Sequence, residues 1–402
     1  MKFIKRLFLL VLFIAGALVG YAQYKNLAFT DYEGILASLQ QDVSDWVAAS
    51  QQAEAESSEE VEITEQQNLS SEPAPKKRER LRVPANPYSQ LDRYVRACPT
   101  EAEVDVATLA AYLGERASSD IEKARAIYIW LTDNIYYDDE GFNTGNYSDT
   151  SPSGVLANRT SVCDGYSSLF FALGYEMDLD VLKITGYAKG YGYQPGKRFS
   201  RSDHAWNAVR IDNEWRIFDA TWGAGNGKSV NGNLVSTQVF EEYWFDVDPY
   251  EAIFNHYPED PAYTFVEPSL SLRQYEQFPY VRKGYHQLMQ NGKQIYNSSL
   301  AGELTRFPDA YSVKTYLKTV TMPLERELEL GQSYSFVLQA PEAEAVALID
   351  AEGNWEQLED DYGEFSVDYQ PTTTGELKLG VKTSAKQEYA IVLVYEVVGQ
   401  VQ

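Results

Sequence analysis

Cysteine and histidine are scarce in this chain, and their scarcity narrows the chemistry it can carry. The 402 residues include two cysteines, Cys98 and Cys163, and three histidines, His204, His256 and His286. Two cysteines allow at most one disulfide, which excludes a disulfide-stapled scaffold. The sequence contains no metal-ligand spacing, no phosphate-binding glycine loop and no dinucleotide-binding fingerprint. We therefore expect neither a metal nor a cofactor.

Positive charge is also in short supply. The chain has 34 lysines and arginines against 59 aspartates and glutamates, which gives a formal net charge of −25 at pH 7. Such an acidic surface repels nucleic acid and offers no basic patch for docking on anionic lipid. Hydrophobic residues make up 44% of the chain and aromatic residues 13%. The composition and length therefore allow two compact domains with extensions.

The N-terminus has the residue order of a secretory signal peptide. Three basic residues precede an apolar run over residues 7–19, and small residues follow up to Ala22. The run is slightly short for a membrane span, so we predict cleavage after Ala22, with an uncleaved anchor as the alternative. In either case we expect the protein to be secreted or at the cell surface, touching the membrane only through an N-terminal anchor.

Composition and pattern divide the chain into four regions. Residues 1–22 are the signal peptide or anchor. Residues 23–83 form an N-terminal extension and disordered spacer, because glutamate, glutamine, serine and proline dominate between 50 and 80 and little there could be buried. We place a first folded domain at residues 84–266 and a β-rich domain at residues 267–402.

Local patterns predict helices in the first domain and strands in the second. Residues 104–117 have helical spacing, and Ser119 with Glu122 forms a capping box at the start of another helix. That helix carries apolar residues on one side: Ile121, Ala124, Ile127, Leu131 and Ile135. After Tyr311, short β-rich segments alternate with turn residues, which is typical of a small β-sandwich. The predicted fold class is α+β.

The surroundings of Cys163 favour a nucleophile. The residues after it have the pattern of a helix with Leu169, Phe170 and Leu173 facing inward, which places Cys163 at the helix N-terminus. Unpaired N–H groups and the helix dipole favour a thiolate there. The same N–H groups could stabilise an oxyanion on a substrate that the sulfur attacks.

His204 and Asp219 come together if the segments around them form a β-hairpin. Two strand-like segments flank Asp212-Asn213, a two-residue turn whose residues tolerate positive φ. If the residues beside the turn pair, Asp219 falls opposite Trp206 and on the same face as His204, a diagonal neighbour about 7–8 Å away. A register shift of one residue would put the two on opposite faces.

The segments around these residues resemble the transglutaminase-like superfamily. The matching segments are Val162–Tyr166, His204–Asn207 and Trp215–Gly223, preceded by a strand at 184–190. Further on, residues 243–249 and 256–258 resemble the branch that contains the kyphoscoliosis peptidase and related bacterial proteins. In this chain Ser161 stands where the family usually has glycine, two residues before the cysteine.

The resemblance implies a papain-like α+β core with Cys163 as nucleophile, His204 as base and Asp219 as the acid that orients the imidazole. It also implies acyl transfer at an amide, by transamidation or by hydrolysis. Three aromatic residues are predicted to contact substrate, with core packing as the alternative: Trp206, Trp222 and Tyr166.

Structural roles compete with the catalytic ones. A Cys98–Cys163 disulfide would remove the nucleophile. Because Cys98 lies outside the matched segments, we predict a free Cys163 and a small buried Cys98. We expect His256 to be a structural or rim residue.

We therefore predict an extracytoplasmic cysteine enzyme that performs acyl transfer or hydrolysis at peptide amides through a Cys163 thioester. Its expected partner is an extracellular protein or a cell-wall peptide. The alternative is a non-catalytic binding module that keeps the fold. An inaccessible Cys163 thiol would favour that alternative.

Overall fold

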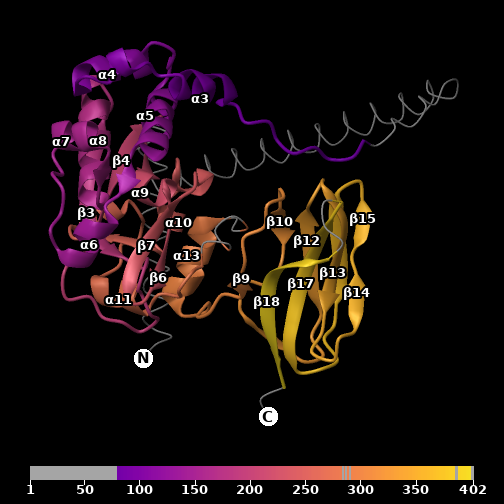
Figure 1. The fold of residues 1–402 in the computed structure, drawn as a ribbon. Coiled ribbons are helices and arrows are strands. Elements are labelled where there is room, and N and C mark those ends of the chain that lie inside the picture. The colour runs from indigo at the N-terminus through magenta and orange to yellow at the C-terminus, as the bar shows by residue number, and fades with distance from the viewer. Residues whose placement is uncertain (1–78, 283–284, 286–287, 289–290, 385–387, 400–402) are drawn as a thin grey trace, which may run out of the picture. The chain divides into compact units, whose positions relative to one another are not determined.

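The computed structural model describes residues 79–282, 285, 288, 291–384 and 388–399 (Figure 1). The chain divides into two compact units, residues 1–78 and 79–402, and only the second contains described residues. The predicted signal peptide and most of the predicted spacer lie outside this part. Among the described helices, none is both long and apolar enough to cross a membrane.

Helices form the first part of the described chain, and three of them stand where the sequence predicts a helix: α4, α5 and α8. Figure 1 shows them in indigo to magenta beside strands β3 and β4. Their bounds are α3 (Ser89–Arg96), η1 (Thr100–Ala102), α4 (Val106–Gly114), α5 (Asp120–Asn134), α6 (Asp139–Thr144), α7 (Pro152–Asn158) and α8 (Cys163–Glu176). The capping box of Ser119 and Glu122 is present at the start of α5, as predicted.

Helix α5 is buried on every side. Nine consecutive residues, Ala124 to Thr132, have little or no exposure. The prediction of one apolar face was therefore too narrow, because α5 lies among α3, α4, α8 and strand β4 rather than on the surface. Its only buried charge, Arg125, is neutralised by Asp92 and Glu242, with N–O distances of 2.9 and 2.5 Å.

A four-stranded antiparallel sheet carries the residues of the predicted site. Its order is β5-β4-β3-β8, with bounds β3 (Val181–Ala188), β4 (His204–Ile211), β5 (Glu214–Phe218) and β8 (His256–Pro258). Strands β4 and β5 form the predicted hairpin: Ile211 pairs with Glu214, and Asp212 and Asn213 have φ values of 50° and 69°. The predicted register is confirmed.

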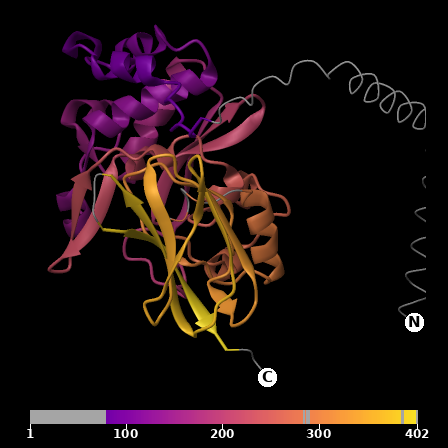
Figure 2. The same ribbon diagram turned by 90° about the vertical axis from the view of Figure 1, so that its right-hand side faces the viewer.

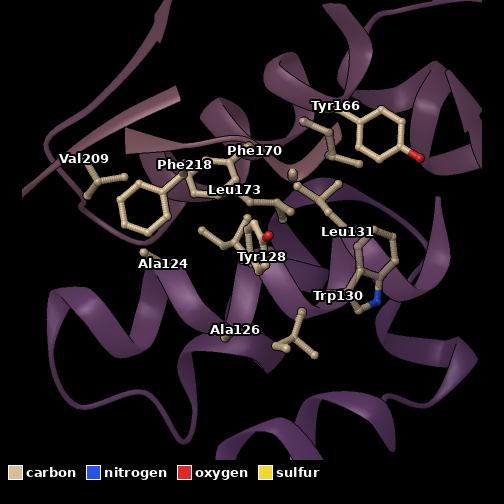
Figure 3. Close-up of a cluster of buried hydrophobic side chains, with 14 of the residues drawn as sticks. Ala124, Ala126, Tyr128, Trp130, Leu131, Tyr166, Phe170, Leu173, Val209 and Phe218 are labelled. Atoms are coloured by element: carbon tan, nitrogen blue, oxygen red, sulfur yellow. The ribbon is translucent and has the colours of Figure 1, made fainter. Parts of the chain in front are cut away.

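Shorter elements complete this part of the chain. They are β1 (Tyr136–Tyr137) paired with β2 (Thr160–Ser161), the hairpin β6 (Gly225–Val230) and β7 (Asn233–Gln238), α9 (Ala220–Gly223), η2 (Glu242–Trp244), α10 (Pro249–Ala252) and η3 (Pro261–Thr264). Figure 3 shows the buried cluster beneath the sheet, in which Tyr128 and Leu131 of α5 and Phe170 and Leu173 of α8 gather near Phe218. Burial of each of these large side chains contributes about 1.5–3 kcal/mol to the stability of this cluster.

Two helices precede the C-terminal strands: α11 (Leu272–Gln277) and α13 (Gly292–Ala301). The first sheet then has the order β10 (Lys318–Thr321), β12 (Tyr334–Gln339), β16 (Glu364–Tyr369), β15 (Glu359–Asp361). The second has the order β11 (Glu327–Glu329), β18 (Ala390–Val398), β17 (Gly375–Thr383), β13 (Ala343–Ile349), β14 (Trp355–Gln357), and β9 (Asp309–Ala310) pairs with β18.

These strands form the predicted β-sandwich-like domain, drawn in orange to yellow in Figure 2. Inward-facing residues of both sheets, such as Phe336, Phe365 and Tyr395, are at most 1% exposed and belong to one cluster. The α+β class is therefore confirmed. The domain boundary at residue 266 stays a prediction.

Candidate active site

Cys163 is the first residue of helix α8, and the chain just before the helix packs closely on its first turn. Val162 caps the helix in an extended conformation. A Cβ at Gly165 would stand 2.0 Å from the Oγ of the buried Ser161, so only glycine fits at 165. Cys163 itself is half-buried. Its N–H group belongs to the first turn of the helix, where N–H groups have no acceptor within the helix.

Asn207 fixes strand β4 against helix α8. Its Nδ2 atom donates to the carbonyl oxygens of Ser167 at 3.0 Å and Leu182 at 3.1 Å, and the side chain is buried. Below it, the rings of Phe170 and Phe218 lie 5.7 Å apart. The helix that begins with Cys163 is thus joined by a polar contact to β4, the strand that begins with His204, and by an apolar contact to its hairpin partner β5.

His204 and Asp219 meet as the hairpin register predicts. The Nε2 atom of His204 lies 2.7 Å from Oδ2 of Asp219, and both residues are buried. Asp219 follows the last residue of β5 and caps α9, because its Oδ1 atom accepts a hydrogen bond from the Trp222 N–H at 3.0 Å. One carboxylate oxygen therefore anchors the local backbone while the other holds the imidazole.

Asp219 stays ionised in this setting. Burial opposes its charge, but His204 and His256 outweigh burial and hold the pKa of Asp219 far below its usual range. A carboxylate only accepts hydrogen bonds, so the Nε2 atom of His204 must carry a proton. The remaining ring nitrogen, Nδ1, is then free to take a proton from Cys163.

Cys163 and His204 interact directly. Burial lowers the pKa of His204, but the charge and hydrogen bond of Asp219, together with a hydrogen bond that the imidazolium donates to the Cys163 sulfur, raise it from 6.5 to about 10. The imidazolium is therefore favoured at neutral pH. The structure thus brings together all three predicted catalytic residues: a thiol, an imidazole and a carboxylate that fixes the imidazole tautomer.

His256 is a fourth member of this cluster that the sequence did not assign to it. Its Nε2 atom donates to the same Oδ2 atom of Asp219 at 2.9 Å. The side chain is 2% exposed, so it is not at a rim, and burial lowers its pKa. Strand β8 brings it there by pairing with β3, where Ala188 lies opposite His256. The sequence held one signal for this role: residues 256–258 lie in a segment that resembles the kyphoscoliosis peptidase branch of the superfamily.

Aromatic rings enclose both histidines. Trp222 stacks on His204 with centroids 5.0 Å apart, and Trp206 stacks on it at 6.0 Å. His256 touches Trp222 at 4.5 Å and Trp244 at 5.2 Å. These rings exclude water from the imidazole–carboxylate contacts and so strengthen them.

The three residues predicted to contact substrate differ in exposure. Tyr166 is buried and donates its hydroxyl to the carbonyl of Ile135 at 2.6 Å, and Trp206 is also buried. Trp222 is half-buried and remains the better candidate for a substrate contact. Tyr137 was not predicted: burial raises its pKa most, and the charge of Cys163 adds to the rise, so the two side chains interact electrostatically.

The two cysteines are not bonded to each other, as predicted. Cys98 is half-buried, and burial with nearby Glu103 raises its pKa to about 11. His204, Asp219 and His256 each offer a potential metal-ligand atom, all within 4.8 Å of one another. The Nε2 atoms of His204 and His256 already hydrogen-bond to Oδ2 of Asp219, so these three atoms are engaged with one another.

Comparison with known proteins agrees with this geometry. Residues 107–220 match the model of the transglutaminase-like superfamily. The chain is 30% identical over 239 residues to the human kyphoscoliosis peptidase, covering 59% of this chain and 34% of that protein. It is 31% identical over 210 residues to the LIM and transglutaminase domain protein ltd-1 of Caenorhabditis elegans, covering 48% and 28%.

The chain thus spans about a third of the length of these curated relatives. Among solved structures, a TGase aligns with a TM-score of 0.24 and 16% identity, over 44% of this chain and 40% of that one. The matched residues include Cys163, His204 and Asp219 and contain helices α5 and α8 with strands β3 to β5. The chain therefore contains a domain of the transglutaminase-like superfamily.

Proposed function

We propose that this protein is a cysteine enzyme that transfers or hydrolyses acyl groups at peptide amides. The observation that carries the proposal is the chain of contacts from Cys163 through His204 to Asp219, in a domain of the transglutaminase-like superfamily. Each contact has the donor and acceptor that the reaction needs. The name of the human relative, a peptidase, is consistent with chemistry at amides.

In the proposed first step, His204 Nδ1 holds the proton of the Cys163 thiol while the sulfur attacks the amide carbonyl carbon. The carbonyl oxygen becomes an oxyanion, which the backbone N–H of Cys163 in the first turn of α8 can stabilise. The C–N bond then breaks, and His204 returns the proton to the leaving amine. The product on the enzyme is a thioester.

The second step releases the acyl group. His204 takes a proton from water or from an amine, which attacks the thioester carbon, and returns that proton to the departing sulfur. Water yields a carboxylic acid and an amine yields a new amide, so the same thioester serves a protease or a crosslinker. Throughout, Asp219 keeps Nε2 of His204 protonated and stabilises the imidazolium.

We place this reaction outside the cytoplasm, because a basic, apolar and then small-residue order opens the chain. Extracellular proteins and cell-wall peptides are the substrates available there. The second candidate function is a binding module that keeps the fold without turnover. The low exposure of His204, 8%, and the Trp222 ring stacked on its imidazole favour this candidate.

Iodoacetamide alkylation of the full chain, mapped by mass spectrometry, tests the proposal. Cys98 is an internal control, because its raised pKa of about 11 makes it a slow thiol. We expect Cys163 to react at least about tenfold faster than Cys98 at neutral pH, and His204→Ala to remove that advantage. Equal rates at the two cysteines, or a Cys163 rate unaffected by the substitution, would leave the binding module as the function.

A further inference from the structure

A cavity of about 690 Å³ lies outside the cysteine site and concentrates positive charge. Its lining includes five arginines and only two acidic residues, Glu276 and Asp309. We call it the arginine pocket; its arginines are Arg198, Arg273, Arg282, Arg306 and Arg326. Such a cluster is unusual in a chain with a net charge of −25, whose surface otherwise repels anions.

The two acids of the arginine pocket are already engaged. Asp309 pairs with Arg282 at 3.3 Å and also with Arg326. Glu276 accepts a hydrogen bond from the backbone N–H of Phe199 at 2.8 Å. The two lining acids therefore neutralise only part of the charge of the five arginines.

Three guanidinium groups remain available. Within the described part of the chain, Arg198, Arg273 and Arg306 form no ion pair, and all three residues are exposed. Buried Phe278, Pro279, Phe307 and Pro308 supply an apolar floor between them. A concave site with an apolar floor and a few convergent polar groups is typical of ligand-binding pockets, and its volume lies within their usual range of about 300–1,000 Å³.

One loop joins the arginine pocket to the cysteine site. The loop runs from residue 189 to 203, between β3 and β4, and ends next to His204. Gly190 lies against the Trp222 ring, where a Cβ would be 2.5 Å from a ring carbon, and the Tyr193 N–H donates to the Gly190 carbonyl at 3.0 Å. Tyr193 and Arg198 in turn line the pocket.

The chemistry of the pocket selects carboxylates on a chain. A guanidinium group presents paired N–H donors that match a carboxylate, and three separate guanidinium groups need several carboxylates held by one ligand. We propose that the arginine pocket binds an acidic segment of the peptide substrate, rich in aspartate or glutamate, while a neighbouring amide reaches Cys163. This inference rests on the proposed function for the identity of the ligand as a substrate.

Binding of fluorescein-labelled hexaglutamate to the full chain, followed by fluorescence anisotropy, tests the proposal. We expect Arg198→Gln combined with Arg273→Gln to weaken binding about 100-fold, or about tenfold for each lost charge-assisted contact. Labelled hexaglutamine should bind far more weakly than hexaglutamate. Arg273→Lys, which keeps the charge but loses the paired donors, should have an intermediate affinity.

The matched control removes two exposed arginines elsewhere. Arg116→Gln combined with Arg210→Gln changes the net charge equally, and these residues make only long ion pairs of 3.9 and 3.7 Å. It should leave the affinity for hexaglutamate nearly unchanged. Equal weakening by both double variants would show general electrostatic attraction and overturn the proposal. So would displacement of hexaglutamate by inorganic phosphate at a lower concentration than by unlabelled hexaglutamate, because the ligand would then be phosphate.

This binding measurement needs no turnover, so it fails separately from the proposed function. If Cys163 proves unreactive while hexaglutamate binding depends on Arg198 and Arg273, the enzyme proposal falls and the acidic-peptide site stands. If Cys163 is activated but hexaglutamate does not bind, the enzyme proposal stands and the acidic-peptide site falls. With both intact, the Arg198→Gln, Arg273→Gln variant should raise KM for an acidic acyl donor and leave kcat unchanged.

Discussion

Asp219→Asn is the substitution that tests the site most directly, because it removes one charge and preserves the shape. Oδ1 of Asp219 accepts a hydrogen bond from the Trp222 N–H, and this donor keeps the amide oxygen of an asparagine on that side. The Nδ2 group then takes the place of Oδ2 and faces His204 and His256. An amide N–H can only donate, so His204 must change its tautomer: Nε2 becomes the unprotonated acceptor and Nδ1 carries the proton. The imidazole then presents a donor to Cys163 and cannot accept its proton.

The size of the effect follows from the electrostatics of His204. Burial alone would lower its pKa, and the charge and hydrogen bond of Asp219, with a smaller contribution from Cys163, raise it from 6.5 to about 10. That rise corresponds to roughly 5 kcal/mol in favour of the imidazolium. Asp219 accounts for most of it. We expect Asp219→Asn to slow acyl transfer, and alkylation of Cys163, by about 10²–10⁴-fold.

The pH dependence of stability gives an independent measure of the same contact. Because the pKa of His204 is raised in the folded chain, its imidazolium stabilises the fold fully below about pH 6.5, and this contribution is lost as the pH rises through about 10. Free energies of unfolding in urea should therefore differ most between wild type and Asp219→Asn near pH 6.5. The difference should shrink as the pH approaches 10.

Asp105→Asn is the matched control, because Asp105 also caps a helix by accepting from a backbone N–H, that of Thr108, but lies outside the histidine cluster. In the Asp105→Asn variant, Cys163 should be alkylated at the wild-type rate. An Asp219→Asn variant that alkylates as fast as this control, or a stability difference independent of pH, would refute the tautomer argument.

Two further substitutions test the surroundings of the site. His256→Phe removes one hydrogen-bond donor to Asp219 within the aromatic enclosure, so alkylation of Cys163 should slow about tenfold. His256→Gln keeps a side-chain donor and should restore part of the rate. Equal alkylation rates in the two variants would make His256 a packing residue only. Arg125→Met leaves the buried Asp92 without its charged partner and should lower the free energy of unfolding by about 3–5 kcal/mol in urea titration. Arg96→Met, which breaks an exposed pair with Asp133, should cost about 1 kcal/mol or less. Similar losses for the two arginines would contradict the account of α5.

Helix α5 shows where local pattern reaches its limit. Its start was predictable, because the capping box of Ser119 and Glu122 is a contact between residues three apart. Its burial was not, because Arg125 looks like a surface residue until Asp92 and Glu242 neutralise it. These two acids come from α3 and η2, and no periodicity within α5 reports them.

The sequence by itself determined the contact between His204 and Asp219. A two-residue turn sets the register of a hairpin, and strand alternation then decides which side chains share a face. The helix position of Cys163 was equally local, since the apolar spacing of Leu169 to Leu173 needs only the residues that follow it.

Only the tertiary structure decided that His256 shares the carboxylate of Asp219 and that five arginines line one pocket. His256 reaches its place through the pairing of β8 with β3, across about 70 residues of chain. The arginines come from a loop, a helix and the start of the β domain. Spacing along the chain carries no signal for such groups, because long-range packing and charge neutralisation, rather than a local backbone period, bring them together.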